Sequence, residues 1–278
     1  MFTQLIGLHF VHVALAAGTT VALLGGLLGP LVVARNNAFA VHGIAELGLT
    51  GAAGGLLLGL DVTTGALLGS VGVGLLLGVL ALRGRDRDTA TGALLAVGLG
   101  FGVLFLSRLH TYATSGFGLL FGSITSVSDR QLRHLLVVTV VVAAALAFVW
   151  RPLWFASVDA EVASARGVPV RALAVVFPVL LAAAVAATIQ VTGVLLILTL
   201  LVTPAAAAQR LTSRPGPTVV LSAALAVLAT TGGILASLQW DAPTSFFIAV
   251  FSFAGYAAAR LSTWHKHRRP WTGHAAVR

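Results

Sequence analysis

Two ionisable side chains, His42 and Glu46, stand inside an apolar stretch of the chain. In a helix, residues four apart lie on one face, about one turn from each other. An imidazole nitrogen and a carboxylate on one face can bind a divalent first-row metal ion or relay a proton. They can also form a structural hydrogen-bonded pair between helices. Because an unpartnered ionisable group is costly at membrane depth, this pair is the leading functional candidate.

Other kinds of chemistry find little support in the sequence. The chain has no cysteine, which excludes disulfides, thiolate metal sites and thiol catalysis. It also lacks the GxxxxGKS/T, HExxH and GxSxG motifs of nucleotide hydrolysis, zinc proteolysis and acyl transfer. A metalloenzyme embedded in the membrane would need a plausible ligand triad, which the sequence does not offer. We therefore expect a protein that is not an enzyme and holds no permanent cofactor.

The elements that must position this pair are membrane-spanning helices. Hydrophobic residues make up 58% of the 278 residues, charged residues only 9%, and the mean hydropathy is +1.00. A soluble domain has about 25% charged residues, and a helix needs about 20 apolar residues to cross a bilayer. We predict an all-α polytopic membrane protein with nine apolar segments, over residues 4–33, 38–60, 62–82, 89–107, 132–150, 170–189, 191–209, 218–238 and 243–261.

The number of crossings is eight or nine, because Pro204 interrupts segment 191–209. Nine crossings leave only Arg108, Arg130 and Arg133 of the 17 Lys and Arg residues on one side of the membrane. The positive-inside rule assigns the other, more basic side to the cytoplasm. The net charge of +9 is then a signal of orientation, with the C-terminus inside, and does not indicate nucleic-acid binding.

Two connections between the apolar segments are long. Residues 108–131 face outward in the nine-crossing topology, and His110 and Asp129 in them are candidate entrance residues. Residues 151–169 face the cytoplasm. They predict a short helix over about 157–168, with an acidic start and a Gly–Pro stop. Such a helix fits a docking surface for a partner, and it fits a plain surface loop equally well.

The chain divides into a transmembrane domain, residues 1–261, and a tail, residues 262–278. The tail is basic and carries two tryptophans. We expect it to lie on the cytoplasmic side, near the headgroups of anionic lipids.

Five stretches, in the right order over nearly the whole chain, resemble the permease subunit of bacterial ABC importers for zinc, manganese and iron. Residues 35–59 are similar to the family's D-A-L-S-H-A-x-L-P-G region around the histidine. The other four are LFGSITSVS at 120–128, DAEVASARG at 159–167, VTGVLLILTLLVTPAAAA at 191–208 and LQWDAPTSFFIAV at 238–250. Each motif is loose alone, and the five in register are specific.

This resemblance implies a fold and a set of partners. The expected assembly is a homodimer of permeases in the bacterial plasma membrane, with two ABC ATPase subunits beneath it and an extracytoplasmic binding protein that delivers the metal. The resemblance also makes the predicted cytoplasmic helix a coupling helix that docks on the ATPase. Its candidate contact residues are Asp159, Glu161, Ala163, Arg166 and Gly167.

One position departs from the family's pattern. The family has an aspartate four residues before the histidine, and this chain has Ala38 there. Glu46 stands where the family has proline, so the carboxylate has moved to the other side of His42 along the same helical face.

We therefore predict the permease subunit of an ATP-driven importer of zinc or manganese, with iron as a third candidate, and His42 and Glu46 as transient ligands. The alternative is a proton- or ion-coupled secondary transporter that uses the same pair as its relay.

Overall fold

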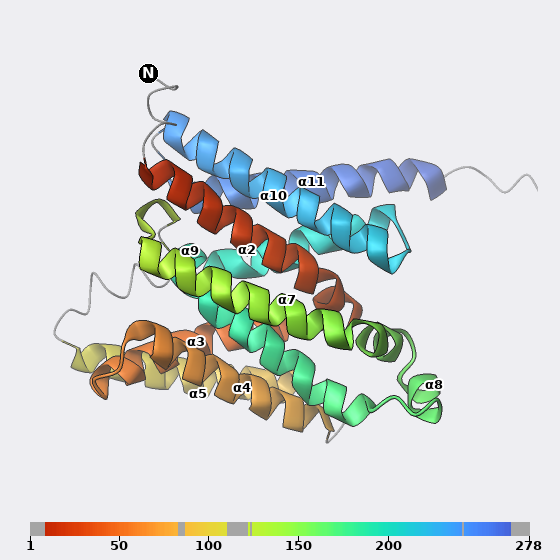
Figure 1. The fold of residues 1–278 in the computed structure, drawn as a ribbon, viewed down its shortest axis with the longest axis horizontal. Helices are drawn as coiled ribbons and strands as arrows, with labels where there is room; N and C mark the ends of the chain where they lie inside the picture. The colour runs from red at the N-terminus through yellow and green to blue at the C-terminus, as the bar shows by residue number, and fades with distance from the viewer. Residues whose placement is uncertain (1–8, 83–86, 110–121, 123, 241, 268–278) are drawn as a thin grey trace, which may run out of the picture.

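The computed structural model describes residues 9–82, 87–109, 122, 124–240 and 242–267, and every regular element in them is helical. The helices are α2 (His9–Ala34), α3 (Ala38–Leu57), α4 (Val62–Leu82), α5 (Arg87–Arg108), η1 (Ile124–Ser126), α7 (Asp129–Val158), α8 (Ala160–Ala165), α9 (Val170–Leu211), α10 (Pro215–Trp240) and α11 (Thr244–His267). They form one bundle (Figure 1).

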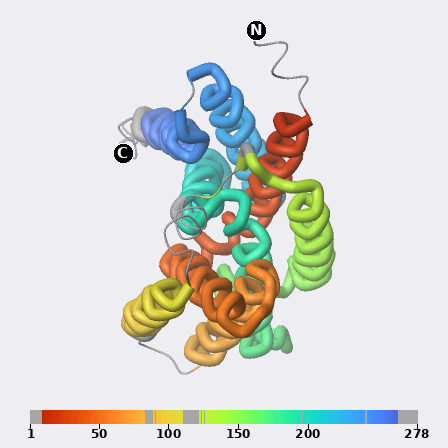
Figure 2. Tube along the Cα trace, turned by 90° about the vertical axis from the view of Figure 1, so that its left-hand side faces the viewer, coloured from red at the N-terminus to blue at the C-terminus, as the bar shows by residue number. Residues whose placement is uncertain are grey.

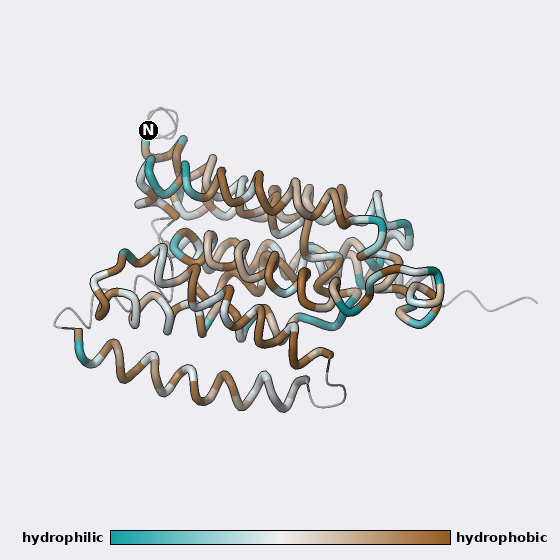
Figure 3. The backbone as a smooth tube through the Cα atoms, turned by 60° about the horizontal axis from the view of Figure 1, so that its bottom comes forward, coloured by the Kyte–Doolittle hydropathy of each residue, from teal (hydrophilic) through white to brown (hydrophobic). Residues whose placement is uncertain are grey.

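Eight of the described helical stretches are long and apolar enough to span a membrane, and a shorter apolar helix covers Leu196–Leu211. Hydrophilic residues gather near the ends of the helices and hydrophobic residues along their lengths (Figure 3). The predicted all-α polytopic membrane protein is therefore confirmed. One predicted segment, residues 62–82, coincides with α4.

The predicted break between segments 170–189 and 191–209 falls at Gly193. This residue has φ 75° and ψ 166°, a conformation open to glycine, and the chain turns back on itself there. The expectation that Pro204 interrupts the second segment is wrong, because the helix continues through it to Leu211. Pro204 leaves the Leu200 carbonyl without its helical N–H partner, and the bare backbone of Gly25 on α2 packs against that carbonyl.

A second backbone contact fixes this reversal. Gly122, with φ 68°, packs so closely on Thr192 and Gly193 that an added Cβ would collide with their backbone atoms. The two stretches that carried the family resemblance at 120–128 and 191–208 therefore meet in space.

The bundle has two ends, which we name after what they carry. The His9 end holds the start of α2, and the α8 end holds α8 and the last residues of α11 (Figure 1). Eight described arginines lie toward the α8 end, whereas only three lie at the His9 end: Arg108, Arg130 and Arg133. This asymmetry agrees with the distribution expected from the sequence. The eight at the α8 end are Arg35, Arg87, Arg151, Arg166, Arg171, Arg210, Arg214 and Arg260.

Two helices are longer than their apolar segments suggested. The segment predicted to end at residue 150 belongs to α7, which continues through Pro152 to Val158. The chain tolerates this proline because buried Leu153 and Ala156 hold the last turns of α7 against the core. Likewise α11 runs to His267, six residues past the predicted domain boundary at 261.

Small residues let these helices approach closely. Gly51 of α3 packs on Gly65 and Gly69 of α4, and Gly74 of α4 packs on the backbone of Pro178 in α9. In a bundle surrounded by lipid, such contacts replace the hydrophobic drive that packs soluble helices. They hold α3 in a fixed position between α4, α5 and α9.

Candidate functional site

The predicted pair His42–Glu46 lies in the first half of α3. On one side of this helix, Val41, Ile44 and Ala45 are fully buried in the main core cluster. On another side, Gly43 packs on Thr91 of α5, with 3.2 Å between an added Cβ and the Thr91 methyl group. The core therefore fixes the rotation of α3 and leaves the face with His42 and Glu46 only partly covered.

The two side chains contact each other directly. His42 Nε2 lies 3.0 Å from Glu46 Oε1, and the side chains are 30% and 18% exposed. The other ring nitrogen of His42, Nδ1, is buried and has no hydrogen-bond partner in the described protein. Such an atom is unusual in a folded protein, because no hydrogen bond compensates its burial.

A metal ion at this pair would need further ligands. No group of three or more His, Cys, Asp or Glu side chains occurs among the described residues. One imidazole and one carboxylate leave two positions of a four-coordinate ion to be filled by water or by another chain. This ligand number suits brief occupancy better than permanent binding.

Helix α3, which carries the pair, lies next to α9 in the bundle. In the view from the His9 end, α5 and α11 stand apart, with α3 and α9 between them (Figure 2). Ala38, the position of the family's aspartate, is the first residue of α3 and is half-buried. Ala38, His42 and Glu46 share one helical face, as the sequence predicts.

The predicted cytoplasmic helix is present as α8 (Ala160–Ala165), shorter than the expected range of 157–168. Asp159 is its N-cap, and its side chain accepts a hydrogen bond of 2.9 Å from the backbone N–H of Val162. Gly167 follows in the left-handed region with φ 80° and ends the helix. Two of the five predicted coupling residues therefore shape the helix.

The remaining three predicted residues divide between core and surface. Ala163 is fully buried and belongs to the same core cluster as Val41 and Ile44, which flank His42. Glu161 and Arg166 are exposed, and so is Val162 between them. The exposed face offers a partner one apolar and two charged side chains, whereas Ala163 attaches the helix to the bundle.

Arg35 connects this region to α3, a role that the sequence did not reveal. Its Nη1 donates a hydrogen bond of 3.1 Å to the Ser157 hydroxyl, and its guanidinium lies 5.4 Å from the centre of the Phe177 ring. Ser157 is in the last turn of α7, two residues before Asp159. Arg35 itself directly precedes the α2–α3 turn, where Asn36 has φ 52°. This contact could not be predicted because Arg35 and Ser157 are far apart in the sequence.

Only one of the two predicted entrance residues lies in the described part of the chain. Asp129 is the first residue of α7, and its Oδ1 lies 3.4 Å from Nε2 of His9, with both side chains exposed. His110 lies outside the described residues. Their role as an entrance remains a prediction.

A cavity of about 1060 Å³ does open at the His9 end between α4, α7 and α9. Gln190 crosses it: its Nε2 donates 2.9 Å to the Thr63 hydroxyl, and its Oε1 accepts 3.4 Å from Gln131. At its rim Asp61 accepts hydrogen bonds from the Thr64 hydroxyl (2.7 Å) and backbone (3.0 Å). These bonds, the hydroxyl's first, hold the pKa of Asp61 below its ordinary value.

Comparison with known proteins adds independent evidence. The ABC 3 transport family matches residues 8–261 of this chain. The chain is similar to the manganese transport system membrane protein MntC of Halalkalibacterium halodurans, with 26% identity over 93% of this chain and 89% of that protein. It is also similar to the high-affinity zinc uptake system membrane protein ZnuB of Haemophilus influenzae, with 24% identity over 82% of this chain and 88% of that one.

The fold has a counterpart among solved structures. The chain superposes on PsaBC from Streptococcus pneumoniae, solved in complex with a Fab, with a TM-score of 0.83 and 23% identity. The superposition covers 93% of this chain and 94% of that one. The whole bundle is thus shared, including the helices that position His42 and Glu46.

Proposed function

Because this chain belongs to the ABC 3 transport family, we propose that it is the permease subunit of an ATP-driven importer of manganese or zinc. It is a multi-pass protein of the bacterial plasma membrane. Its relatives include membrane proteins of manganese and zinc transport systems. In this proposal the chain carries no catalytic site, and separate subunits hydrolyse ATP.

The observation that carries the proposal is the His42–Glu46 contact of 3.0 Å on a partly exposed face of α3. The Glu46 carboxylate gives the site its negative charge, and the His42 imidazole adds a nitrogen ligand. Both manganese and zinc accept such a set. A site with only two protein ligands can release its ion again.

A second copy of the chain would complete the coordination sphere. Helix α3 lies between α5 and α11 in the view from the His9 end (Figure 2), and the pair that it carries is partly exposed. If two copies meet there around a two-fold axis, their His42 and Glu46 side chains supply four ligands in total. The ion would then pass between the subunits, and closing or opening this seam would alternate access.

The docking sites for the other subunits of the importer depend on the orientation of the chain in the membrane. The excess of arginine puts the α8 end in the cytoplasm. Two ATPase subunits dock there, each on the exposed residues Glu161, Val162 and Arg166 of one α8. The His9 end faces outward and receives the ion from an extracytoplasmic metal-binding protein. A cavity between α4, α7 and α9 opens at that end.

Uptake by the purified complex tests the proposal. The full chain and its ATPase subunit are reconstituted in proteoliposomes with the binding protein, and uptake of Mn²⁺ and of Zn²⁺ is measured with and without ATP. We expect ATP-dependent uptake of one ion or both. His42→Ala and Glu46→Ala should each lower it at least about tenfold, while ATPase binding and basal ATP hydrolysis stay unchanged.

His12→Ala is the matched control, because His12 is an exposed histidine on α2. This variant should transport at the rate of the natural chain. Full uptake in both pair variants would refute the assignment of the site. Uptake driven by a proton gradient without ATP would refute the importer and favour the secondary transporter.

A further inference from the structure

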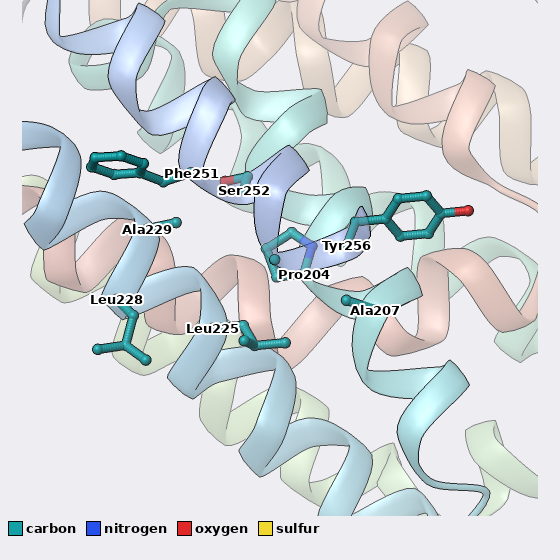
Figure 4. A pocket seen from close by; sticks show the side chains of 9 residues that line it. Pro204, Ala207, Leu225, Leu228, Ala229, Phe251, Ser252 and Tyr256 are labelled. Carbon is teal, nitrogen blue, oxygen red and sulfur yellow. The ribbon is translucent and has the colours of Figure 1, made fainter. Parts of the chain in front are cut away.

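Helices α10 and α11 enclose a second cavity, far from the His42–Glu46 pair. The two helices touch where Gly232 and Gly233 pack on Phe251 and Ile248. From there they diverge toward the α8 end (Figure 1). The space between them measures about 200 Å³, with Pro204 and Ala207 of α9 as its floor. Figure 4 shows these side chains together with those of α10 and α11.

The cavity is apolar and opens to the outside of the bundle. Leu228 and Phe251 at its mouth are 67% and 38% exposed. On a chain that spans a membrane, this surface faces the hydrocarbon of the lipid. A crevice of this form therefore meets acyl chains.

One polar group lies inside the crevice. Ser252 lines it and is only 4% exposed, and its hydroxyl has no hydrogen-bond partner in the described protein. Several serines and threonines of the spans donate to a carbonyl in their own helix, as Thr231 does to Val227 at 2.7 Å. Four buried hydroxyls of the described spans have no partner, on Thr139, Ser222, Thr230 and Ser252, and of these only Ser252 lines the crevice. A buried hydroxyl without a partner is costly, and at this position an acceptor on a bound ligand would satisfy it.

The end of the crevice nearest α8 is positively charged. Arg210 donates a hydrogen bond of 3.2 Å to the Tyr256 hydroxyl and lies 5.4 Å from the centre of its ring. Arg260, one helical turn beyond Tyr256, lies close to the same hydroxyl. No carboxylate lies within 4.0 Å of either arginine among the described residues, whose only ion pairs are His9–Asp129 and His42–Glu46.

The sequence explains why these arginines lack acidic partners. The chain has no Asp or Glu between Glu161 and Asp241, and none after Asp241. Helices α9, α10 and α11 therefore bring only positive charge to the α8 end. An anion from outside the chain is the natural partner of this pair.

We propose that this crevice binds one anionic phospholipid. The phosphate lies between Arg210 and Arg260, one acyl chain enters the crevice above Pro204 and Ala207, and the Ser252 hydroxyl donates to an ester carbonyl of the lipid. Ser252 is one helical turn deeper in the membrane than Tyr256, about 6 Å. The two arginines, the Ser252 hydroxyl and the apolar crevice therefore follow one another in the same order as a lipid's phosphate, ester carbonyl and acyl chain. The site requires a membrane but not a metal, so its failure would leave the proposed importer standing.

Lipid binding by the full-length chain tests this site. The purified chain in phosphatidylcholine nanodiscs is titrated with phosphatidylglycerol, and bound lipid is counted by native mass spectrometry. Two arginines at a membrane surface predict a preference of roughly thirtyfold for phosphatidylglycerol over added phosphatidylcholine. The double variant Arg210→Gln/Arg260→Gln should abolish this preference, whereas the control Arg214→Gln, an exposed arginine in the neighbouring loop, should keep it.

A blocking variant tests the crevice itself. A Cβ added at Gly255 meets nothing within 4 Å, so Gly255→Leu can enter the space without clashing with the backbone. We expect this variant to fold, judged by its melting temperature, and to lose the tightly bound lipid. Equal binding of both lipids, or retention of the lipid by Gly255→Leu, would overturn the proposal. Dimerisation through this face, seen as two chains per nanodisc that Gly255→Leu separates, would overturn it in favour of a second copy.

Discussion

One part of the geometry of His42 could be predicted from the sequence, and another part could not. Its spacing from Glu46 predicted a shared helical face, and the two side chains lie 3.0 Å apart on that face. The buried, unpartnered Nδ1 could not be predicted, because its burial depends on neighbours from other helices. Neither could the partial exposure of the pair, since apolar segments give no information on which faces pack.

The position of the carboxylate relative to His42 is testable by moving it. We expect Glu46→Ala to lose uptake and Ala38→Asp/Glu46→Ala to regain a substantial part of it, measured as initial rates in proteoliposomes. Ala38 and Glu46 are each one turn from His42 on the same face, and an aspartate is favourable in the first turn of a helix.

The control for this exchange is Ala40→Asp/Glu46→Ala. Ala40 is only two residues from His42, so its side chain points to the other side of α3. Equal recovery in both double variants would mean that any nearby negative charge suffices. If Asp at position 38 restores no uptake, the ion needs a carboxylate at the depth of Glu46.

At the scale of elements, the described helices follow the apolar segments wherever a polar turn ends a run. Residues 62–82 became α4 without adjustment. Two errors involve prolines. Pro204 was expected to interrupt its segment, and the segment predicted to end at residue 150 continues through Pro152; both prolines lie inside helices. Sequence rules treat proline as a breaker because of its missing N–H. The backbone of Gly25 packs against the freed Leu200 carbonyl, and only the packed structure shows that contact.

Arg35 is positioned to transmit motion between elements. It joins the α2–α3 turn to the end of α7 and to Phe177 of α9. We expect Arg35→Lys to bind the ATPase and hydrolyse ATP at the basal rate, yet to lose several-fold of the stimulation by metal-loaded binding protein. A lysine keeps the charge but cannot both stack on Phe177 and reach Ser157, and such a charged hydrogen bond contributes about 1.5–3 kcal/mol.

A double-mutant cycle with Ser157→Ala separates this contact from a general loss of stability. If Arg35 acts through Ser157, the combined variant should be little worse than Arg35→Lys alone. Arg171→Lys, an exposed arginine in the first turn of α9, should behave like the natural chain. Additive losses in the cycle would show that the two residues act independently.

The whole molecule depends on the contact between Gly122 and Gly193. The five motifs predicted the family and the order of its parts, but no spacing predicted that two of them touch. Both residues have positive φ, and Gly122 lacks a side chain where the backbone of Thr192 and Gly193 passes. The reversal of α9, and with it the path of the shorter pass Leu196–Leu211, rests on this joint.

Gly122→Ala should therefore destabilise the protein by about 2–5 kcal/mol, since it adds left-handed strain to a collision with backbone atoms. The measurement is thermal unfolding of the purified chain in detergent. Gly72→Ala is the control, because a Cβ there meets nothing within 4 Å. A melting temperature for Gly122→Ala equal to that of Gly72→Ala would show that the contact between Gly122 and Gly193 accommodates an added methyl group without loss of stability.

A joint made of main chain alone also limits how this protein can evolve. Where two side chains meet, a larger one can be offset by a smaller one opposite, and lineages drift by such exchanges. Neither glycine has anything left to remove, so a change at one cannot be rescued at the other. Descendants that retain the turn in α9 should inherit both residues together, while the open positions around them vary.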